Sequence, residues 1–483
     1  MGVEIKSKSG APRQLVMVAA LAALLGGFAV PAAADTVEDL LNKLRDKGIL
    51  NQDEYNEMLR EMRAEQKADA LKEAKATEDA AKEADAKKKA EASGPKTTVS
   101  GKMYVDFTNL DARYTPATGA AVDGGGSAIV NGTNAGGNST GLDVKRFYVS
   151  IDHKFDDMWS ANITTDMHLG RDGTSDSAGA GRTDIFVKKA YVQATIAPEL
   201  WLRAGSADMP WIPYVEGLYG YRYLDNTLTD KIKVGNSADW GLHAGGKVAD
   251  GMFNYALSVV NGNGYSFQTR QKTPDFEGRV NFVPVKGLDL AVGLYSGHLG
   301  KNTQANDNLG TAVTPNRTQN ATREDFLVSY VMPDTFRVGG EYFIAKNYAY
   351  TQAVNANPLP SEKADGYSLW GSFNVTKQFV LFARYDNFKP YEDEIPVGTS
   401  AAATTTASQI SSDYFNLGLS YNVIKGVDVA VAWKHEEDKG INTTASLLAG
   451  NTPGLNANGG AVNAVPGAKT KIDEVGIWTQ IAW

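Results

Sequence analysis

Basic side chains recur at alternate positions from about residue 96 to the end of the chain, which places them on one face of extended segments. Acidic side chains such as Asp106 and Glu341 share that face, and the opposite face is apolar. Charges that line water inside a closed sheet can select a solute by the sign of its charge. The candidate pore-lining and solute-binding residues are Lys102, Arg146, Lys189, Arg203, Arg222, Lys231, Lys233, Arg279, Arg337, Arg384 and Lys434.

No group of residues has the spacing of a catalytic or metal site. The histidines are scattered, with no pair at ligand spacing, and the chain has no Cys, no phosphate-binding glycine loop and no nucleophile elbow. Residues 172–176 only faintly resemble a calcium loop, and the acidic run 392–394 fits a solvated loop tip better than a cation site near lipopolysaccharide. We therefore expect no enzyme activity, no metal and no cofactor.

The charge balance excludes nucleic acid as the main partner. The formal net charge is −8 over 483 residues, and nucleic-acid binding needs a basic surface. Charged residues are 22% of the chain, and glycines number 49. This composition suits a barrel whose alternate residues face water.

Residues 1–34 have the features of a secretory signal peptide. Lys6, Lys8 and Arg13 precede an apolar run over 15–30, and small residues at 32–34 offer a cleavage point. A membrane anchor is the alternative, but the run is shorter than the ~20 residues that span a bilayer.

Residues 35–95 predict an α-helical, periplasmic segment. Apolar residues at helical spacing end at Gly48, and Asn51 or Asp53 can cap a second helix. Residues 64–92 are almost entirely Ala, Lys, Glu and Asp, which favour helix but bury little surface. A trimeric coiled coil and a solvated helix or disordered linker both remain open for this stretch.

From residue 96 to residue 483 the pattern changes to period two, which predicts an all-β transmembrane barrel of about 16 antiparallel strands. Short turns such as 155–157 alternate with long connections such as 208–237, as in a barrel with turns in the periplasm and loops outside. The last strand, 472–483, has one apolar face and ends on Trp483. The expected strands are 98–107, 141–153, 158–168, 184–197, 200–207, 238–249, 252–262, 274–284, 287–298, 322–332, 335–347, 364–375, 378–388, 412–423, 427–437 and 472–483.

The third long connection is unusually aromatic over 208–224. Because folding inward would bury its rings against the wall, we expect this loop inside the pore. Packing of the loop at a contact between subunits is the alternative.

The export signal, the helical stretch 39–55 and the barrel pattern together resemble the phosphate-selective porin O and P family of bacterial outer membranes. The resemblance implies a homotrimer, a third loop folded into the channel, and anions guided by arginines and a lysine-lined constriction. The lysine-rich constriction is not visible here, because the charges of the third loop are of mixed sign.

We therefore expect an outer-membrane porin for passive diffusion of small hydrophilic solutes, most simply anions such as phosphate, with lipid and lipopolysaccharide as surroundings. The alternative is an envelope-tethering protein whose helical segment contacts the cell wall.

Overall fold

The computed structural model describes residues 32–115, 122–123, 138–169, 183–266, 268, 270, 272–300, 320–348, 363–389, 395–396, 404–405, 411–441 and 464–483. The chain divides into two compact units, Met1–Ser93 and Gly94–Trp483. Most of the expected signal peptide, the loop 172–176 and the acidic run 392–394 lie outside the described residues, so these interpretations stay predictions.

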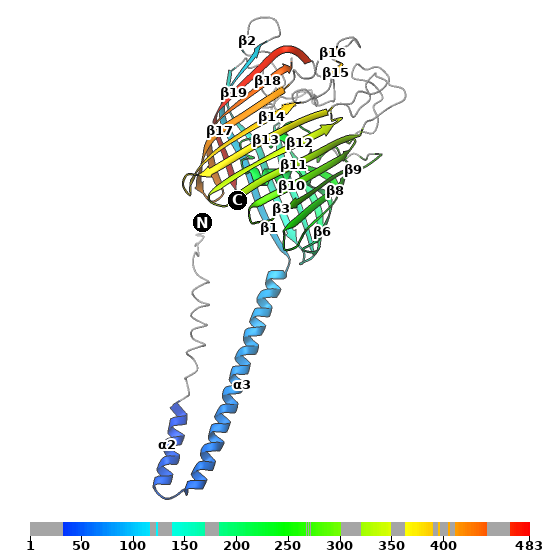
Figure 1. Cartoon of the computed structure of the whole chain (residues 1–483). Coiled ribbons are helices and arrows are strands. Elements are labelled where there is room, and N and C mark those ends of the chain that lie inside the picture. Colours follow the sequence, from blue (N-terminus) through cyan, green and yellow to red (C-terminus); the bar gives the residue numbers. More distant parts are fainter. Residues whose placement is uncertain are drawn as a thin grey trace, which may run out of the picture. The chain divides into compact units, whose positions relative to one another are not determined.

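The first unit is a helical hairpin of α2 (Ala32–Asp46) and α3 (Gln52–Ser93) (Figure 1). The chain leaves α2 through Gly48, whose φ of 67° is the left-handed conformation of a helix C-terminus. Asn51 then caps α3, because its Oδ1 accepts hydrogen bonds from the backbone N–H groups of Asp53 (3.0 Å) and Glu54 (2.9 Å). The Glu54 carboxylate returns a bond to the Asn51 N–H at 3.0 Å, which completes a capping box.

The described contacts between the two helices include a small apolar core near their connection and an ion pair of 3.0 Å between Arg63 and Glu38. Leu41 and Tyr55 are buried between them, and the Tyr55 hydroxyl donates to Asn42 Oδ1 at 2.8 Å. Leu40 and Leu71 are 56% and 63% exposed, so apolar side chains of the hairpin remain open to a further partner. Whether α3 joins a coiled coil therefore stays a prediction.

Among the described residues, no helix combines the length and the apolar character needed to cross a bilayer.

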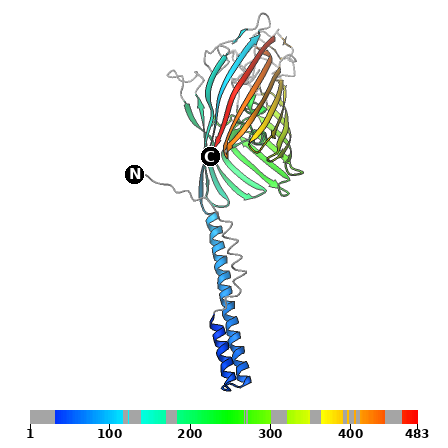
Figure 2. The same cartoon turned by 90° about the vertical axis from the view of Figure 1, so that its left-hand side faces the viewer.

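The second unit is a closed barrel of sixteen antiparallel strands (Figures 1 and 2), as the alternation predicts. Each barrel strand pairs with its neighbour in the chain, and β1 also pairs with β19 to close the ring. The barrel strands are β1 (Lys96–Thr115), β3 (Asn138–Lys154), β4 (Trp159–Leu169), β5 (Thr183–Ala197), β6 (Leu200–Asp208), β7 (Ala238–Val248), β8 (Phe253–Val260), β9 (Asp275–Phe282), β10 (Leu288–Gly297), β11 (Ala321–Met332), β12 (Phe336–Lys346), β13 (Lys363–Asn374), β14 (Phe379–Lys389), β17 (Ser411–Ile424), β18 (Val427–Ile441) and β19 (Ala464–Ala482).

Three short strands complete the described sheet structure. The two-residue β2 (Val122–Asp123) pairs with β1, and β15 (Ile395–Pro396) pairs with β16 (Thr404–Thr405).

The closing seam is held by the end of the chain. The backbones of Gly101 and Trp483 exchange two hydrogen bonds of 3.1 Å, and the Trp483 ring lies directly over Gly101. A Cβ atom at position 101 would lie 2.0 Å from that ring, so only glycine fits without movement. The Phe147 ring flanks it at 5.9 Å.

The outer face of the barrel is apolar, as in a wall that contacts lipid. Side chains such as Val431, Ile477 and Val475 are 57%, 45% and 52% exposed, and their strand neighbours on the other side are buried. A water-soluble surface does not expose a continuous apolar band of this kind.

Strands β1 and β19 are longer than expected, since β1 continues to Thr115 and β19 begins at Ala464. Charged residues replace the apolar ones there, so the period-two pattern of hydrophobicity stops before the backbone pairing does.

Candidate functional site

The connection between β6 and β7 lies inside the barrel. This stretch, Met209–Ser237, is called the constriction segment and contains the short helices α4 (Ile212–Tyr219) and α5 (Leu228–Lys231). Its apolar side chains form one buried cluster with lumen-facing residues of seven strands: Tyr104, Ala291, Leu327, Trp370, Phe382, Ala430, Ala432 and Trp478. The expectation that the aromatic loop folds inward is confirmed, and packing on the outside of the barrel is wrong.

Trp211, near the start of the segment, is its largest fully buried side chain. Its backbone N–H donates to the Glu277 carboxylate at 2.9 Å, and its indole N–H donates to Glu341 at 3.2 Å. Gly293 makes room for the ring, because a Cβ there would lie 2.6 Å from Trp211 Cε3.

A buried arginine ties the end of the segment to the wall. Arg323 is fully buried, pairs with Glu277 at 3.0 Å and with Asp325 at 2.8 Å, and donates to the Val234 carbonyl oxygen. The guanidinium and its two carboxylates are thus closed off from solvent. A buried charge is tolerated only when it is paired in this way.

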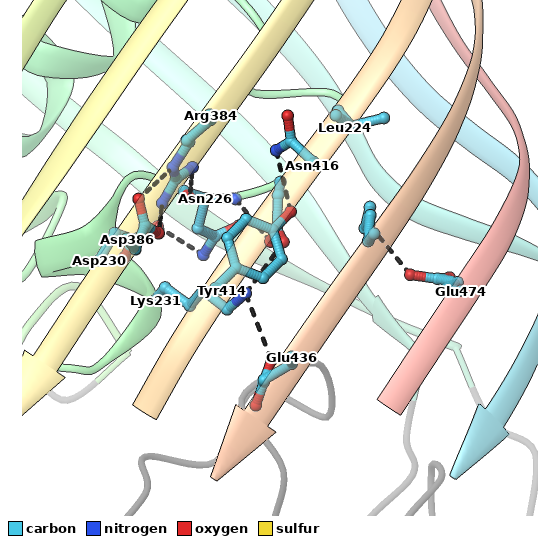
Figure 3. Close-up of polar contacts among 12 residues, drawn as sticks. Leu224, Asn226, Asp230, Lys231, Arg384, Asp386, Tyr414, Asn416, Glu436 and Glu474 are labelled. Atoms are coloured by element: carbon cyan, nitrogen blue, oxygen red, sulfur yellow. Dashed lines mark hydrogen bonds and ion pairs between the residues drawn. The ribbon is translucent and has the colours of Figure 1, made fainter. Parts of the chain in front are cut away.

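A second buried cluster holds the middle of the segment (Figure 3). Arg384 pairs with Asp386, its Nε lying 2.8 Å from Oδ1, and donates to the Asn226 carbonyl oxygen. Lys231 lies 3.3 Å from the centre of the Tyr414 ring and 3.6 Å from the Glu436 carboxylate. These contacts hold the backbone just before α5, and the Lys231 side chain within it, against the wall.

A third cluster surrounds Asp225. Burial alone would raise the pKa of the Asp225 carboxyl, but the positive charges of Lys231, Lys434 and Lys145 overcome this and hold its pKa well below the usual 3.8. Lys231 is the nearest of the three, at 3.2 Å. Asp225 is therefore an ionised anchor rather than a proton carrier.

The opposite wall presents cations differently. In β3, Tyr104 pairs with Arg146 and Val105 pairs with Val144, which leaves Lys145 as an extra residue in a β-bulge. Lys145 and Arg146 therefore both face the lumen. Lys145 lies 3.0 Å from Asp106, and Arg146 lies 3.5 Å from Asp166.

Strand β5 repeats the arrangement. Thr164 pairs with Lys189 and Thr165 pairs with Val187, so Lys188 is the extra residue. Lys188 Nζ lies 3.4 Å from the Tyr148 hydroxyl oxygen and 4.9 Å from the centre of that ring. Lys189 Nζ lies 3.1 Å from the Asp208 carboxylate.

On β6, Arg203 is held by neutral partners. Its guanidinium lies 4.7 Å from the Tyr191 ring and 4.4 Å from the Trp201 ring, and it donates to Gln193 Oε1 at 2.6 Å. Arg203, Tyr191 and Gln193 remain partly exposed, because the constriction segment does not cover this wall.

The expected site residues fall into three groups. Lys102, Arg146, Lys189 and Arg203 lie on the lumen side of β1, β3, β5 and β6 and keep some exposure. The second group lies in the segment or contacts it. Arg222 pairs with Glu216 and Asp230 inside the segment, and Lys233 of the segment is exposed. From the wall, Arg279 donates to the Pro210 carbonyl oxygen, and Arg337 donates to those of Gly217 and Leu218. Lys231, Arg384 and Lys434 are buried, which corrects their expected place on the open lining. The segment covers Arg384 and Lys434 on the wall, and Lys231 lies on the side of the segment that packs against the wall.

Alternation missed Lys145 and Lys188, because a bulge shifts the parity of every following residue. It also missed Arg323, whose clustering with Glu277 is visible only in three dimensions. Among the described residues, no group of three or more His, Cys, Asp or Glu side chains is arranged to hold a metal ion.

Comparison with known proteins identifies the fold alone. No protein-family profile matches the chain, and no curated protein matches it. Among solved structures, the anion-selective porin from Comamonas acidovorans is similar at 13% identity and a TM-score of 0.50, over 80% of this chain and 100% of that chain. The outer membrane channel DcaP of Acinetobacter baumannii matches at 11% identity and a TM-score of 0.48, over 81% and 98%. The chain thus has the sixteen-strand barrel fold seen in outer-membrane porins.

Proposed function

We propose that the protein is an outer-membrane channel for passive diffusion of small hydrophilic anions, such as phosphate. The observation that carries the proposal is the pair of bulges in β3 and β5, each of which turns two neighbouring cations toward the lumen. Lys145 donates to the Leu224 carbonyl oxygen of the constriction segment and Lys188 is buried, whereas Arg146 and Lys189 keep some exposure. A solute that crosses the barrel therefore meets a wall of positive charge.

The partners of these cations support an anion preference. Lys188 and Arg203 contact aromatic rings and neutral oxygens, so their hydrogen bonds do not neutralise them. Aromatic faces stabilise a cation without cancelling its charge. An anion can therefore exchange its water for contacts with the partly exposed Arg203, and the buried charge of Lys188 adds to the attraction, whereas a cation is repelled.

Planar-bilayer recording of the purified protein tests the proposal. We expect discrete conductance steps, and in a salt gradient a reversal potential that indicates preferential passage of the anion. Absence of any conducting step rules out a channel, and a cation-selective reversal potential rules out the anion preference alone. A series of potassium salts with larger anions then gives the size limit.

The resemblance to phosphate-selective porins also suggests a phosphate preference and a homotrimer. The helical stretch 39–55 and the inward third loop support the resemblance to phosphate-selective porins, but the described constriction segment pairs its Arg222 and Lys231 with carboxylates. We therefore propose a general anion channel before a phosphate-specific one. Cross-linking in detergent tests the trimer.

A tethering role is the second candidate, and the helical hairpin favours it. α3 runs for 42 residues, and the described side chains beyond residue 64 are exposed. A periplasmic stalk of this kind could reach the cell wall. Deletion of residues 35–93 should then leave conductance unchanged and make the envelope leakier to large dyes, whereas an unchanged envelope contradicts tethering.

A further inference from the structure

A group of basic side chains lies on the outer face of the barrel, above the apolar band. Counting from Trp483 at the turn end of the barrel, about ten residues of tilted strand cover the ~25 Å of an outer-membrane hydrocarbon layer. That distance ends near Asp473 of β19. The outward-facing residues beyond it are Lys471 and Lys469, opposite Glu437 and Lys439 of β18.

Lys439, Lys469 and Lys471 converge on one carboxylate. Their Nζ atoms lie 3.4, 2.7 and 3.3 Å from the Glu437 oxygens. Glu437 keeps 17% of its side-chain surface exposed, whereas the three lysines keep 48%, 35% and 47%. Lys439 also lies 3.5 Å from the Asp413 carboxylate, so two acids position three ammonium groups and leave a net positive charge.

The adjoining strands extend this group. Arg113 of β1 pairs in register with Lys471, and Asp413 of β17 pairs with Glu437. The two outermost outward-facing rows on these four strands therefore hold four basic residues and two acidic ones: Arg113, Lys439, Lys469 and Lys471, with Asp413 and Glu437. We call the four basic residues the basic collar.

We propose that the basic collar binds the phosphate groups of lipid A in the outer leaflet. The side chains face away from the lumen, so a solute inside the channel cannot reach them. One row of residues, in which His435 pairs with Asp473, separates the collar from exposed apolar residues such as Val475 and Trp433. A ligand with acyl chains below and phosphates above requires this order of apolar and basic residues. Phosphate oxygens accept charge-assisted hydrogen bonds from ammonium and guanidinium groups.

Outward basic residues are distributed unevenly around the rim, and they are densest on β18 and β19. On the other side of the barrel, the outward residues near the same end include Ile185 of β5, Val259 of β8 and Phe276 of β9, which are 74%, 39% and 52% exposed. Further outward lysines continue along β12–β14 at Lys346, Lys363 and Lys389. The lipid site is therefore centred on β18 and β19 rather than spread evenly around the barrel.

The site rests on the proposed orientation, with the long connections outside the cell. The test measures binding of the purified full-length protein to bis-phosphorylated lipid A and to dephosphorylated lipid A by native mass spectrometry. The variant is Lys439→Gln/Lys469→Gln/Lys471→Gln. The matched control is Lys286→Gln/Lys377→Gln/Lys425→Gln, which removes the same charge from exposed residues of the turns at the opposite end.

We expect the wild type to bind phosphorylated lipid A at least tenfold more tightly than the dephosphorylated form. The collar variant should lose that tenfold preference, the control should keep it, and replacing the three lysines by arginine should preserve it. Equal binding by the collar variant overturns the site. Competition by inorganic phosphate at equal concentration also overturns it, because the ligand is then a free anion.

Two further readouts separate this site from the channel. Heat-modifiable migration on gels shows whether the collar variant is folded, and a variant that does not fold is replaced by Lys469→Gln alone. Single-channel conductance should be unchanged in the collar variant. A wild-type protein that prefers phosphorylated lipid A but conducts no current contradicts the channel proposal and leaves the lipid site standing.

Discussion

The two walls of the lumen both carry basic side chains, but several of those on one wall are buried in ion pairs, whereas several of those on the other remain in contact with solvent. On the wall from β9 to β19, Arg323, Arg384 and Lys434 are buried beneath the constriction segment, where carboxylates neutralise them. On the wall from β3 to β6, Arg146 and Arg203 keep contact with solvent, and Arg203 has neutral partners. The position of one folded loop thus decides whether a basic residue holds the structure or faces a solute.

This difference separates stability from selectivity. Removing a covered cation leaves buried carboxylates without a partner and should loosen the constriction segment. Removing Arg203, whose partners are neutral, leaves no buried charge unpaired, so it should change the ions that pass with little change in folding. The four predictions below test the separation, from the largest expected effect to the smallest.

Arg323→Ala should give the largest loss of stability. It leaves Glu277 and Asp325 buried without their guanidinium and frees the Val234 carbonyl oxygen, so we expect a loss of about 3–5 kcal/mol in the free energy of unfolding. Urea unfolding in lipid vesicles measures it. The control is Arg203→Ala on the open wall, and equal losses for the two variants would contradict the distinction between the walls.

Asp225→Asn should weaken the centre of the constriction segment. The pKa of Asp225 lies well below its ordinary 3.8, because Lys231, Lys434 and Lys145 outweigh the effect of burial. A carboxyl whose pKa is lower in the folded state than in the unfolded state stabilises the fold. This contribution is complete above the pKa of the unfolded state and is lost as the pH falls through the pKa of the folded state. We expect Asp225→Asn to lower the free energy of unfolding at pH 7 by about 2 kcal/mol, which is typical for the loss of a charged hydrogen bond.

The same carboxyl predicts a pH dependence. Between pH 7 and about pH 4 its contribution should be constant, and below that it should decline. Unfolding followed at several pH values checks this, and in Asp225→Asn the acid-dependent part should be smaller. An Asp225→Asn variant with the full wild-type acid dependence would show that other carboxyls are responsible.

Gly293→Ala should displace the first anchor of the segment. The new Cβ would lie 2.6 Å from the Trp211 ring and 2.9 Å from Asp325 Oδ2, so the ring or the wall must move. Overpacking of this kind costs about 1–3 kcal/mol. Gly371→Ala is the matched control, because its Cβ would meet only the Arg337 carbonyl oxygen at 3.7 Å. Increased conductance noise in Gly293→Ala alone would show that the segment has become mobile.

The sequence predicted the barrel well because alternation is a direct record of which side faces lipid. All sixteen expected strands are present, and the aromatic stretch 208–224 correctly indicated a loop inside the lumen. It could not show which cations that loop covers, because Arg384 and Lys434 have the same parity signal as Arg203. Nor could it show the bulges at Lys145 and Lys188, since one inserted residue leaves the neighbouring apolar pattern intact.

Neutralising the open wall should give the smallest energetic effect and the clearest functional one. Lys188→Gln/Lys189→Gln removes two lumen-facing charges, of which Lys188 is bonded to a tyrosine rather than to a carboxylate. A unit charge at about 6 Å in water is worth roughly 0.7 kcal/mol, so the anion-to-cation permeability ratio should fall about threefold per charge. Reversal potentials at 0.1 M salt measure it, and the effect should shrink at 1 M as screening shortens its range. Lys231→Met, at a buried position of α5 that packs against the covered wall, should leave the ratio unchanged. If it changes the ratio as much as the β5 pair does, the covered wall also lines the path of the ions.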